Sequence, residues 1–304
     1  MPKELTHWII AQRSLDALDG WSETSILLRE YYDLYLAGSV LPDTLLHLVR
    51  GPDAGIALDL ADLFHDTGKN SYAPLIRVET NSENALTPET KACLLGVLCH
   101  MQADIVFHPF VHSVSGWDDI GRHYRLETEI DCCLVRNGAG PPVKLMQEII
   151  GGEKSELATE VCRILFDPQG RLSKSGAADA LGLHCKYQGM YDSFLWKMLV
   201  VVGGRLPLKS LRQQRHLFYP IFGSEREKTL AGEGSWKHPV TGILQKTTLN
   251  DLVDLAVSRT AAFFLQIDEQ KSFKAVLEDA RGENLLTGLY GVQKKNLKVL
   301  SLTT

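Results

Sequence analysis

Apolar residues along this chain recur mostly at the three- and four-residue spacing of amphipathic helices, whereas the alternation typical of half-buried strands is scarce. A clear late example is the helical stripe formed by Leu252, Leu255, Ala256, Arg259, Ala262 and Phe263. The pattern predicts an all-α protein in which several helices pack as a bundle.

Prolines and capping residues predict where these helices begin and end. Thr87 followed by Pro88 is a favourable helix start, because proline at the first helical position gives up a hydrogen bond that was not available there. Pro109 is expected to end the same helix, which gives it a length of about twenty residues. Further helices are predicted over 22–38, 53–64, 123–135, 143–150, 156–166 and 193–202.

The organisation changes in the second half of the chain. Between Gly203 and Gly242 the sequence becomes irregular, with segments such as GGRLP and FGSEREKTLAGEGSW, before helical spacing returns. We therefore place a boundary near Phe166, which separates residues 1–166 from a helical C-terminal region, 167–304, that packs on them. No internal repeat or low-complexity tract is visible, which argues against a solenoid or a disordered array.

The charge balance narrows the range of partners. The chain of 304 residues has 32 Lys and Arg against 37 Asp and Glu, and its formal net charge is -5. This balance supplies no general positive field for a polyanion, so we expect no stable complex with nucleic acid. Any phosphate group must be held by a local site.

Targeting and membrane signals are also weak. The first residues, MPKELTHWIIAQRSLDALDG, lack the basic and apolar regions of a secretory signal. The longest uninterrupted apolar runs, such as Met198 to Val202, are far shorter than the roughly 20 residues that span a bilayer. The six cysteines contain no CxxC pair. We therefore expect a cytoplasmic protein without a transmembrane segment, whose cysteines are reduced and mostly part of the core.

Histidines and carboxylates with helical spacing carry the chemistry. His100, Asp104 and His108 stand at i, i+4 and i+8, which places three side chains along one face of a helix. His123 and Glu127 repeat the four-residue spacing on the next predicted helix. One histidine beside an apolar stripe is usually structural, but five aligned residues on two helices favour a metal site. Imidazole nitrogen and carboxylate oxygen are typical ligands of catalytic zinc.

Two further candidates are ambiguous when considered alone. Asp43 follows Pro42 in the segment AGSVLPD, where a polar loop residue is the simple interpretation. His65 ends a predicted helix in DLFHDTG, where the helix dipole favours an imidazole for structural reasons. Neither residue indicates a metal site without other support.

Taken together, these segments resemble a known family. THW near the start, AGSVLPD, FHDTG, CHMQADIVFHP and RHYRLETEID resemble, in this order, the zinc-ligand segments of the zinc-dependent phospholipase C family. That family is related to bacterial phospholipase C, to the N-terminal domain of glycosylphosphatidylinositol phospholipase D and to P1-type nucleases. The resemblance covers about the first half of the chain. It implies a phospholipase C/P1 nuclease-like bundle, with 1–166 as the catalytic region and a helical C-terminal extension.

The resemblance also implies a ligand set for two or three zinc ions. One zinc would be held by Asp43, His65, His100 and Asp104, a second by the bridging Asp104 with His7, and a third by His108, His123 and Glu127. In the best-known members an N-terminal tryptophan amine completes the second site, whereas here Trp8 follows the histidine. If Met1 is removed, the amine of Pro2 can take that place.

The implied reaction is hydrolysis of a phosphodiester by a zinc-activated water, and Asp43 is the candidate to orient or deprotonate that water. No GxSxG, Walker or GxGxxG motif points to another mechanism. We expect a phospholipid or a related headgroup ester ahead of single-stranded nucleic acid as the substrate.

Three alternatives stay open. The segment LFHDTGK also resembles the adjacent His and Asp of HD-type phosphohydrolases, a P1-like nuclease would use the same metal site, and a helical binding module can retain zinc for stability alone. Residues without an evident metal partner are interpreted as structural or exposed: His112, His184, His216, His238, and the basic helix face of Lys209, Arg212 and Arg215.

Overall fold

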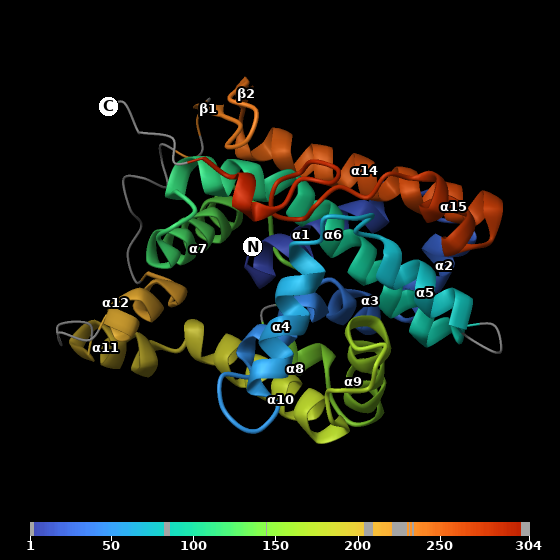
Figure 1. Cartoon of the computed structure of the whole chain (residues 1–304), viewed down its shortest axis with the longest axis horizontal. Coiled ribbons are helices and arrows are strands. Elements are labelled where there is room, and N and C mark those ends of the chain that lie inside the picture. The colour runs from blue at the N-terminus through green and yellow to red at the C-terminus, as the bar shows by residue number, and fades with distance from the viewer. Residues whose placement is uncertain are drawn as a thin grey trace.

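The computed structural model describes residues 3–81, 86–143, 145–203, 209–220, 230, 232 and 234–298. Within these ranges the regular structure is helical apart from one antiparallel hairpin, β1 (Gly234–Lys237) and β2 (Leu244–Thr247), in which Trp236 faces Gln245. Figure 1 shows the helices packed around one another, with the hairpin at the edge. The all-α prediction is confirmed.

The helices follow one another with short connections. In chain order they are α1 (Glu4–Asp16), α2 (Glu23–Glu30), α3 (Tyr32–Gly38), η1 (Leu41–His47), α4 (Ala54–His65), α5 (Ala73–Asn81), α6 (Pro88–Ser115), α7 (Ile120–Arg136), α8 (Met146–Ile149), α9 (Glu153–Phe166), α10 (Lys174–Tyr191), α11 (Phe194–Gly203), α12 (Lys209–Gln214), η2 (Arg215–Leu217), α14 (Leu249–Gln270), α15 (Phe273–Asp279) and η3 (Lys294–Asn296).

Helix α6 forms the centre of the molecule. It begins as predicted at Thr87, whose hydroxyl accepts the N–H of Thr90 at 3.2 Å. It packs against α1, α3, α7 and α14, and its position among these helices is visible in Figure 1. By length and composition α6 is apolar enough to cross a membrane, but that apolar stretch is entirely buried inside the protein. Its apolar side chains therefore belong to the core.

Two glycines let α3 approach α6 closely. A side chain at Gly38 would place its Cβ 2.0 Å from the carbonyl oxygen of Cys93, and one at Gly96 would place its Cβ 2.2 Å from that of Tyr35. Only glycine leaves room for backbone on both sides of this contact. The close approach brings the end of α3 next to His100, one turn beyond Gly96.

The prediction that Pro109 ends the central helix is wrong, because α6 continues to Ser115. Pro109 has no N–H, so the carbonyl of Ile105 loses its helical partner at this point. The C-terminal segment covers it: a Cβ on Gly288 would lie 2.8 Å from Ile105 O and 2.9 Å from Pro109 Cγ. Packing against this segment encloses the interruption, so the helix is not forced to stop there.

Other boundaries also differ from the prediction. The helix expected over 22–38 is divided at Tyr31, so that α2 contacts α14 while α3 packs on α6. The helix expected over 143–150 is reduced to α8, which starts where the Glu148 carboxylate accepts the N–H of Leu145. Part of the region expected to be irregular forms α12 and the hairpin.

The C-terminal elements enclose the N-terminal ones. α14 packs on α6 and α1, and α10 packs on α9 and η1. After α15, Asn284 donates to Asp66 Oδ1 at 3.0 Å and to the carbonyl of Thr67 at 2.9 Å. Residues beyond Phe166 therefore contribute to the surroundings of the first half, and the boundary placed there stays a prediction.

The six cysteines are free thiols. Four of them are buried, and burial raises the pKa of the Cys93 thiol to about 12 and that of Cys99 to about 11. Such thiols stay protonated at neutral pH, so their contribution is to the core.

Candidate metal centre

The helical face predicted from the sequence is present on α6. His100, Asp104 and His108 are each 0% exposed. His100 Nε2 lies 3.2 Å from Asp104 Oδ2, and His108 Nδ1 lies 3.8 Å from the same oxygen. Since α6 is buried from Ala92 to Val111, these polar groups face one another inside the protein.

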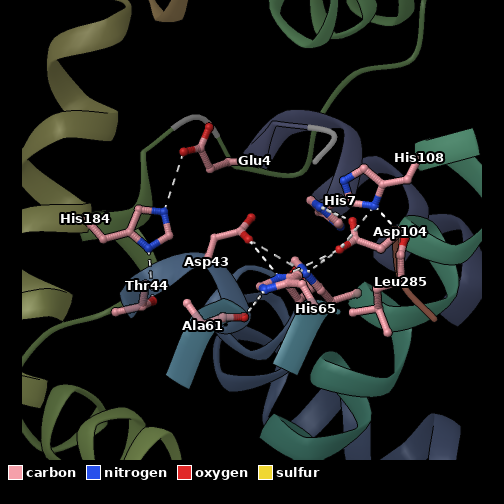
Figure 2. A network of polar contacts seen from close by, with 12 residues as sticks. Glu4, His7, Asp43, Thr44, Ala61, His65, Asp104, His108, His184 and Leu285 are labelled. Carbon is pink, nitrogen blue, oxygen red and sulfur yellow. Dashed lines mark hydrogen bonds and ion pairs between the residues drawn. The ribbon is translucent and has the colours of Figure 1, made fainter. Parts of the chain in front are cut away.

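Three residues from other elements converge on Asp104. His7 on α1 places Nε2 3.6 Å from Asp104 Oδ1, and His65 at the end of α4 places Nε2 3.9 Å from Asp104 Oδ2. Asp43 on η1 lies on the near side, with Oδ1 3.5 Å from His65 Nε2 and 3.9 Å from His100 Nε2. Figure 2 shows these side chains pointing toward a common centre.

These separations suit a metal ion. Ligand atoms held at 2.0–2.2 Å around a tetrahedral zinc lie about 3.4 Å from one another, whereas a direct charged hydrogen bond is about 2.8 Å long. Groups whose ligand atoms lie within 4.8 Å of one another are His7 with Asp43 and His100, and His65 with His100 and Asp104. Asp104 faces His7 with one oxygen and His65 and His100 with the other, as a bridging carboxylate must.

Backbone carbonyls fix the orientation of three of the imidazoles. The Nδ1–H group donates to Ala61 O at 2.8 Å in His65, to Ser39 O at 2.9 Å in His100 and to Leu285 O at 2.6 Å in His108. A carbonyl oxygen only accepts, so Nδ1 carries the hydrogen and the lone pair is on Nε2. Hydrogen bonding of this kind commonly orients histidines that bind metal.

Many of the inward-facing atoms have no hydrogen-bond partner among the described residues. They are both ring nitrogens of His7, Asp43 Oδ1, both oxygens of Asp104, and Nε2 of His65, His100 and His108. Leaving a buried polar atom unpaired costs about 1–3 kcal/mol, and more for a charged group. Divalent cations bound between these residues would supply partners for most of these atoms, so the donor set fits zinc.

A second group lies further along α6. His123 and Glu127 come from α7, which begins where Asp119 accepts the N–H groups of Gly121 and Arg122. His123 Nε2 lies 2.7 Å from Glu127 Oε1, and the ring of His108 is 6.1 Å from that of His123. His108, His123 and Glu127 form the third arrangement that can hold a metal ion.

His112 lies beside this group, although sequence reasoning assigned it no partner. Its ring is 5.5 Å from that of His108 and 5.2 Å from that of His123. Both ring nitrogens are buried without a hydrogen-bond partner among the described residues. Burial lowers the pKa of His112 to about 3. Its position four residues after His108 was the signal that could have found it.

Burial keeps three of the candidate histidines neutral. Burial holds the pKa of His7, His108 and His123 well below the usual value, so these imidazoles are neutral, as ligands must be. Burial also lowers the pKa of His100, but Asp104 and Asp43 outweigh it and raise the pKa. The reverse holds for Asp43: burial raises its pKa, but His100 and His65 outweigh burial and lower the pKa.

The adjacent residues His65 and Asp66 have different partners. Asp66 Oδ1 accepts from Asn284 Nδ2 at 3.0 Å and from the N–H of Lys294 at 2.7 Å. Asp66 therefore holds the C-terminal segment, while His65 faces Asp43 and Asp104. The proposed Pro2 ligand lies outside the described residues.

The remaining histidines separate into two kinds. His216 and His238 are partly exposed, and His238 Nδ1 accepts the N–H of Val240 at 3.2 Å in the turn of the hairpin. That contact agrees with a structural role. His184 is instead fully buried close to Asp43, beside Glu4 and His47, a grouping that sequence reasoning missed.

The protein is a helical bundle in which imidazoles and carboxylates from α1, η1, α4, α6 and α7 converge. This is the arrangement of a helical metal-binding protein. The family model for zinc-dependent phospholipase C matches residues 6–163, more than half of the chain. The chain belongs to this zinc-dependent hydrolase family. Its matched segment contains all eight predicted ligands. No curated protein and no solved structure matched the chain in the corresponding comparisons.

Proposed function

We propose that this protein is a zinc-dependent phosphodiester hydrolase of the phospholipase C type, which cleaves a phospholipid or a related headgroup ester. The observation that carries the proposal is the set of buried, unpaired ligand atoms around Asp104, in a chain of the zinc-dependent phospholipase C family. Imidazole and carboxylate ligands are typical of catalytic zinc sites, whereas structural zinc sites are rich in cysteine.

The residues divide the work of hydrolysis. Zinc, when bound, lowers the pKa of water toward 7 and neutralises charge on the phosphate oxygens. Asp43 is the candidate to orient the attacking water and accept its proton, because its side chain is 14% exposed while that of Asp104 is fully buried. The lowered pKa of Asp43 keeps it a carboxylate that can accept a hydrogen bond. Asp104 and the histidines hold the site together.

One surface feature supports a lipid substrate over a nucleic acid. Helix α11 contains no buried residue, and Phe194, Leu195 and Val202 are 69%, 66% and 62% exposed. Ten residues are too few to span a bilayer but enough to lie in its interface. Single-stranded nucleic acid would instead favour aromatic residues interleaved with a basic groove.

The location of α11 agrees with this use. α11 contacts α12, and α12 packs on α7, the helix that carries His123 and Glu127. Figure 1 shows α11 and α12 together at one end of the molecule. Between α7 and α12 lies an open pocket of about 490 Å³. Its charged lining consists of Arg122, Arg125, Arg212 and Arg215 together with Asp118 and Asp119, so the arginines outnumber the acidic residues. Arginines beside an apolar helix suit the phosphates of a membrane surface.

The alternatives make different predictions about turnover. A P1-like nuclease would use the same ligands on single-stranded DNA or RNA, and a zinc-stabilised binding module would retain the ions without turnover. The HD-type alternative is disfavoured because Asp66 bonds to Asn284 and Lys294. We also propose a cytoplasmic location, which fits the free cysteines of the chain.

A product-resolved screen separates these functions. The zinc-loaded protein is incubated with phospholipid vesicles, single-stranded DNA, RNA and an aryl phosphodiester, and Asp104→Asn is the control. We expect diacylglycerol and a phosphorylated headgroup from the vesicles. Cleavage of DNA or RNA without lipid cleavage would assign the protein to the nuclease branch, and zinc retention without any turnover would favour the binding module.

A further inference from the structure

A separate group of metal-binding side chains lies on the other side of Asp43. It consists of Glu4 on α1, His47 on η1 and His184 on α10, whose ligand atoms lie within 4.8 Å of one another. Figure 2 shows Glu4, His184 and Thr44 on one side of Asp43, with His65, Asp104 and His7 on the other. Glu4, His47 and His184 are not part of the ligand set implied by the family resemblance.

The orientation of His184 matches that of the histidines in the main centre. Its Nδ1 lies 3.0 Å from Thr44 Oγ1, and its Nε2 lies 3.5 Å from Glu4 Oε1. When Nδ1–H donates to the threonine hydroxyl, the lone pair of Nε2 points toward Glu4. In His65, His100 and His108 as well, Nδ1 is hydrogen-bonded to a neighbouring oxygen and Nε2 is left as the candidate metal ligand.

Unpaired buried atoms point into the space between these side chains. Glu4 is 7% exposed and His184 is 0% exposed. Glu4 Oε2 and His184 Nε2 are both buried with no hydrogen-bond partner within the described part of the chain. The 3.5 Å between Nε2 and Oε1 exceeds the length of a charged hydrogen bond and is close to the roughly 3.4 Å between two ligands of one zinc ion.

His47 completes the group in a way that also occurs in the main centre. Its ring stacks on that of His184 with centroids 4.2 Å apart and planes inclined by 17°. The rings of His7 and His100 stack with the same 4.2 Å separation and an angle of 10°. Such pairs present nitrogens side by side, as two imidazole ligands of one ion do.

Lys3, the basic residue next to Glu4, makes its close contacts with other groups. Lys3 precedes Glu4, and its ammonium group donates to the carbonyl of Leu217. The same group lies 4.2 Å from the ring centroids of both Tyr191 and Tyr219. These contacts hold the lysine within its own set of partners, which leaves the Glu4 carboxylate to face the two histidines.

We propose that Glu4, His47 and His184 form an additional zinc site, separate from the centre around Asp104. Two imidazoles and one carboxylate are a ligand set used by catalytic zinc, with the fourth position open to water or to a phosphate oxygen. The site shares helix η1 with Asp43, so an ion there lies next to the predicted catalytic carboxylate. The proposal stands whether or not the protein hydrolyses a phosphodiester.

Anomalous X-ray scattering tests the site directly. Crystals of the zinc-loaded protein are measured on both sides of the zinc absorption edge. We expect an anomalous peak about 2.0–2.2 Å from a ligand atom of each of Glu4, His47 and His184, in addition to the peaks around Asp104. Peaks around Asp104 with none between these three residues would overturn the proposal.

Zinc content in solution gives a second test. His47→Gln and His184→Gln should each lose one zinc per chain by elemental analysis, while His238→Gln, on the hairpin turn, should lose none. His47 is the less buried of the two residues, so its variant is the safer one to fold, and thermal melting of each variant checks this. Unchanged zinc content in folded His47→Gln would contradict the proposal. A filled site in a protein without hydrolysis would defeat only the proposed function.

Discussion

Helices α6 and α11 are both strongly apolar, yet they occupy opposite environments. The apolar stretch of α6 is completely buried, whereas α11 has no buried residue in the described structure. In α6 the apolar side chains are packed in the core, and His100, Asp104 and His108 are fully buried beside them. In α11 the same kinds of side chain face outward.

Apolar composition therefore predicts that a helix will be covered from water, but it does not tell whether the rest of the protein or another surface covers it. For α6 the excluding material is the protein itself, so metal ligands can sit in a dry interior where electrostatic interactions are strong. We propose that the surface of a lipid bilayer covers the apolar side chains of α11. One helix would then bind the ions and the other would bring the protein to its substrate.

The largest effect is expected for the bridging carboxylate of α6. Asp104→Asn removes the charge that faces His7 on one side and His65 and His100 on the other, so it should release more than one zinc ion. Hydrolysis should fall at least about 100- to 1,000-fold, the range for losing a single electrostatic contact in an active site.

Elemental analysis and turnover of an aryl phosphodiester measure both consequences. Met101→Leu is the control, because Met101 is equally buried on α6 but has no ligand atom in the cluster. Full zinc content and normal turnover in Asp104→Asn would contradict a bridging role for Asp104.

The next largest effect concerns the packing that holds α6. Gly96→Ala would place a Cβ 2.2 Å from the carbonyl of Tyr35, so we expect a loss of about 3 kcal/mol in the free energy of unfolding. Gly55→Ala is the matched control: Gly55 lies in α4 with nothing within 4 Å of a new Cβ, and alanine there should stabilise by about 0.4–1 kcal/mol. Denaturant unfolding of the zinc-free proteins compares the two, and equal stabilities would argue against a tight α3 contact.

A smaller effect is expected on α11. Leu195→Glu replaces an exposed apolar side chain by a charge, so it should weaken binding to vesicles of neutral and anionic phospholipid by about tenfold, given 1.5–3 kcal/mol for a buried leucine. Turnover of a soluble aryl phosphodiester should not change. Leu255→Glu is the control, since Leu255 is an exposed leucine on α14, distant in sequence from α11. If both variants bound vesicles as well as the unmodified protein, α11 would have no role in membrane binding.

The smallest effect is expected for the arginines beside α11. Arg212→Gln should reduce binding to anionic vesicles about fivefold, since one basic residue near such a surface contributes about 1 kcal/mol. Binding to neutral vesicles should stay the same, and the difference should shrink at high salt because exposed charges are screened. Co-sedimentation at two salt concentrations measures this, and a loss that is equal on both kinds of vesicle would indicate damage to the fold.

The sequence predicted the parts of the site that depend on one helix at a time. The spacing of His100, Asp104 and His108 was enough to place them on one face, and His123 with Glu127 followed the same rule. Asp43 lies within the short helix η1 and His65 is the last residue of α4, and neither has a second residue of the implied ligand set on its own element. Only the family resemblance brought them into the predicted set.

What the sequence did not predict depends on contacts between distant segments. The group of Glu4, His47 and His184 is assembled by the packing of α10 on η1, with no spacing to indicate it. The carbonyl of Leu285 orients His108 across 177 positions of the chain. Pro109 was given the wrong role for a similar reason, because the segment around Gly288 encloses the interruption it makes in α6.

The most direct test of the account is product analysis of phospholipid vesicles treated with metal-free, zinc-reconstituted and Asp104→Asn protein. The account predicts diacylglycerol and a phosphorylated headgroup from the zinc-reconstituted protein alone, in proportion to the zinc bound. A folded protein with its full zinc content that cleaves neither phospholipid nor an aryl phosphodiester would contradict it.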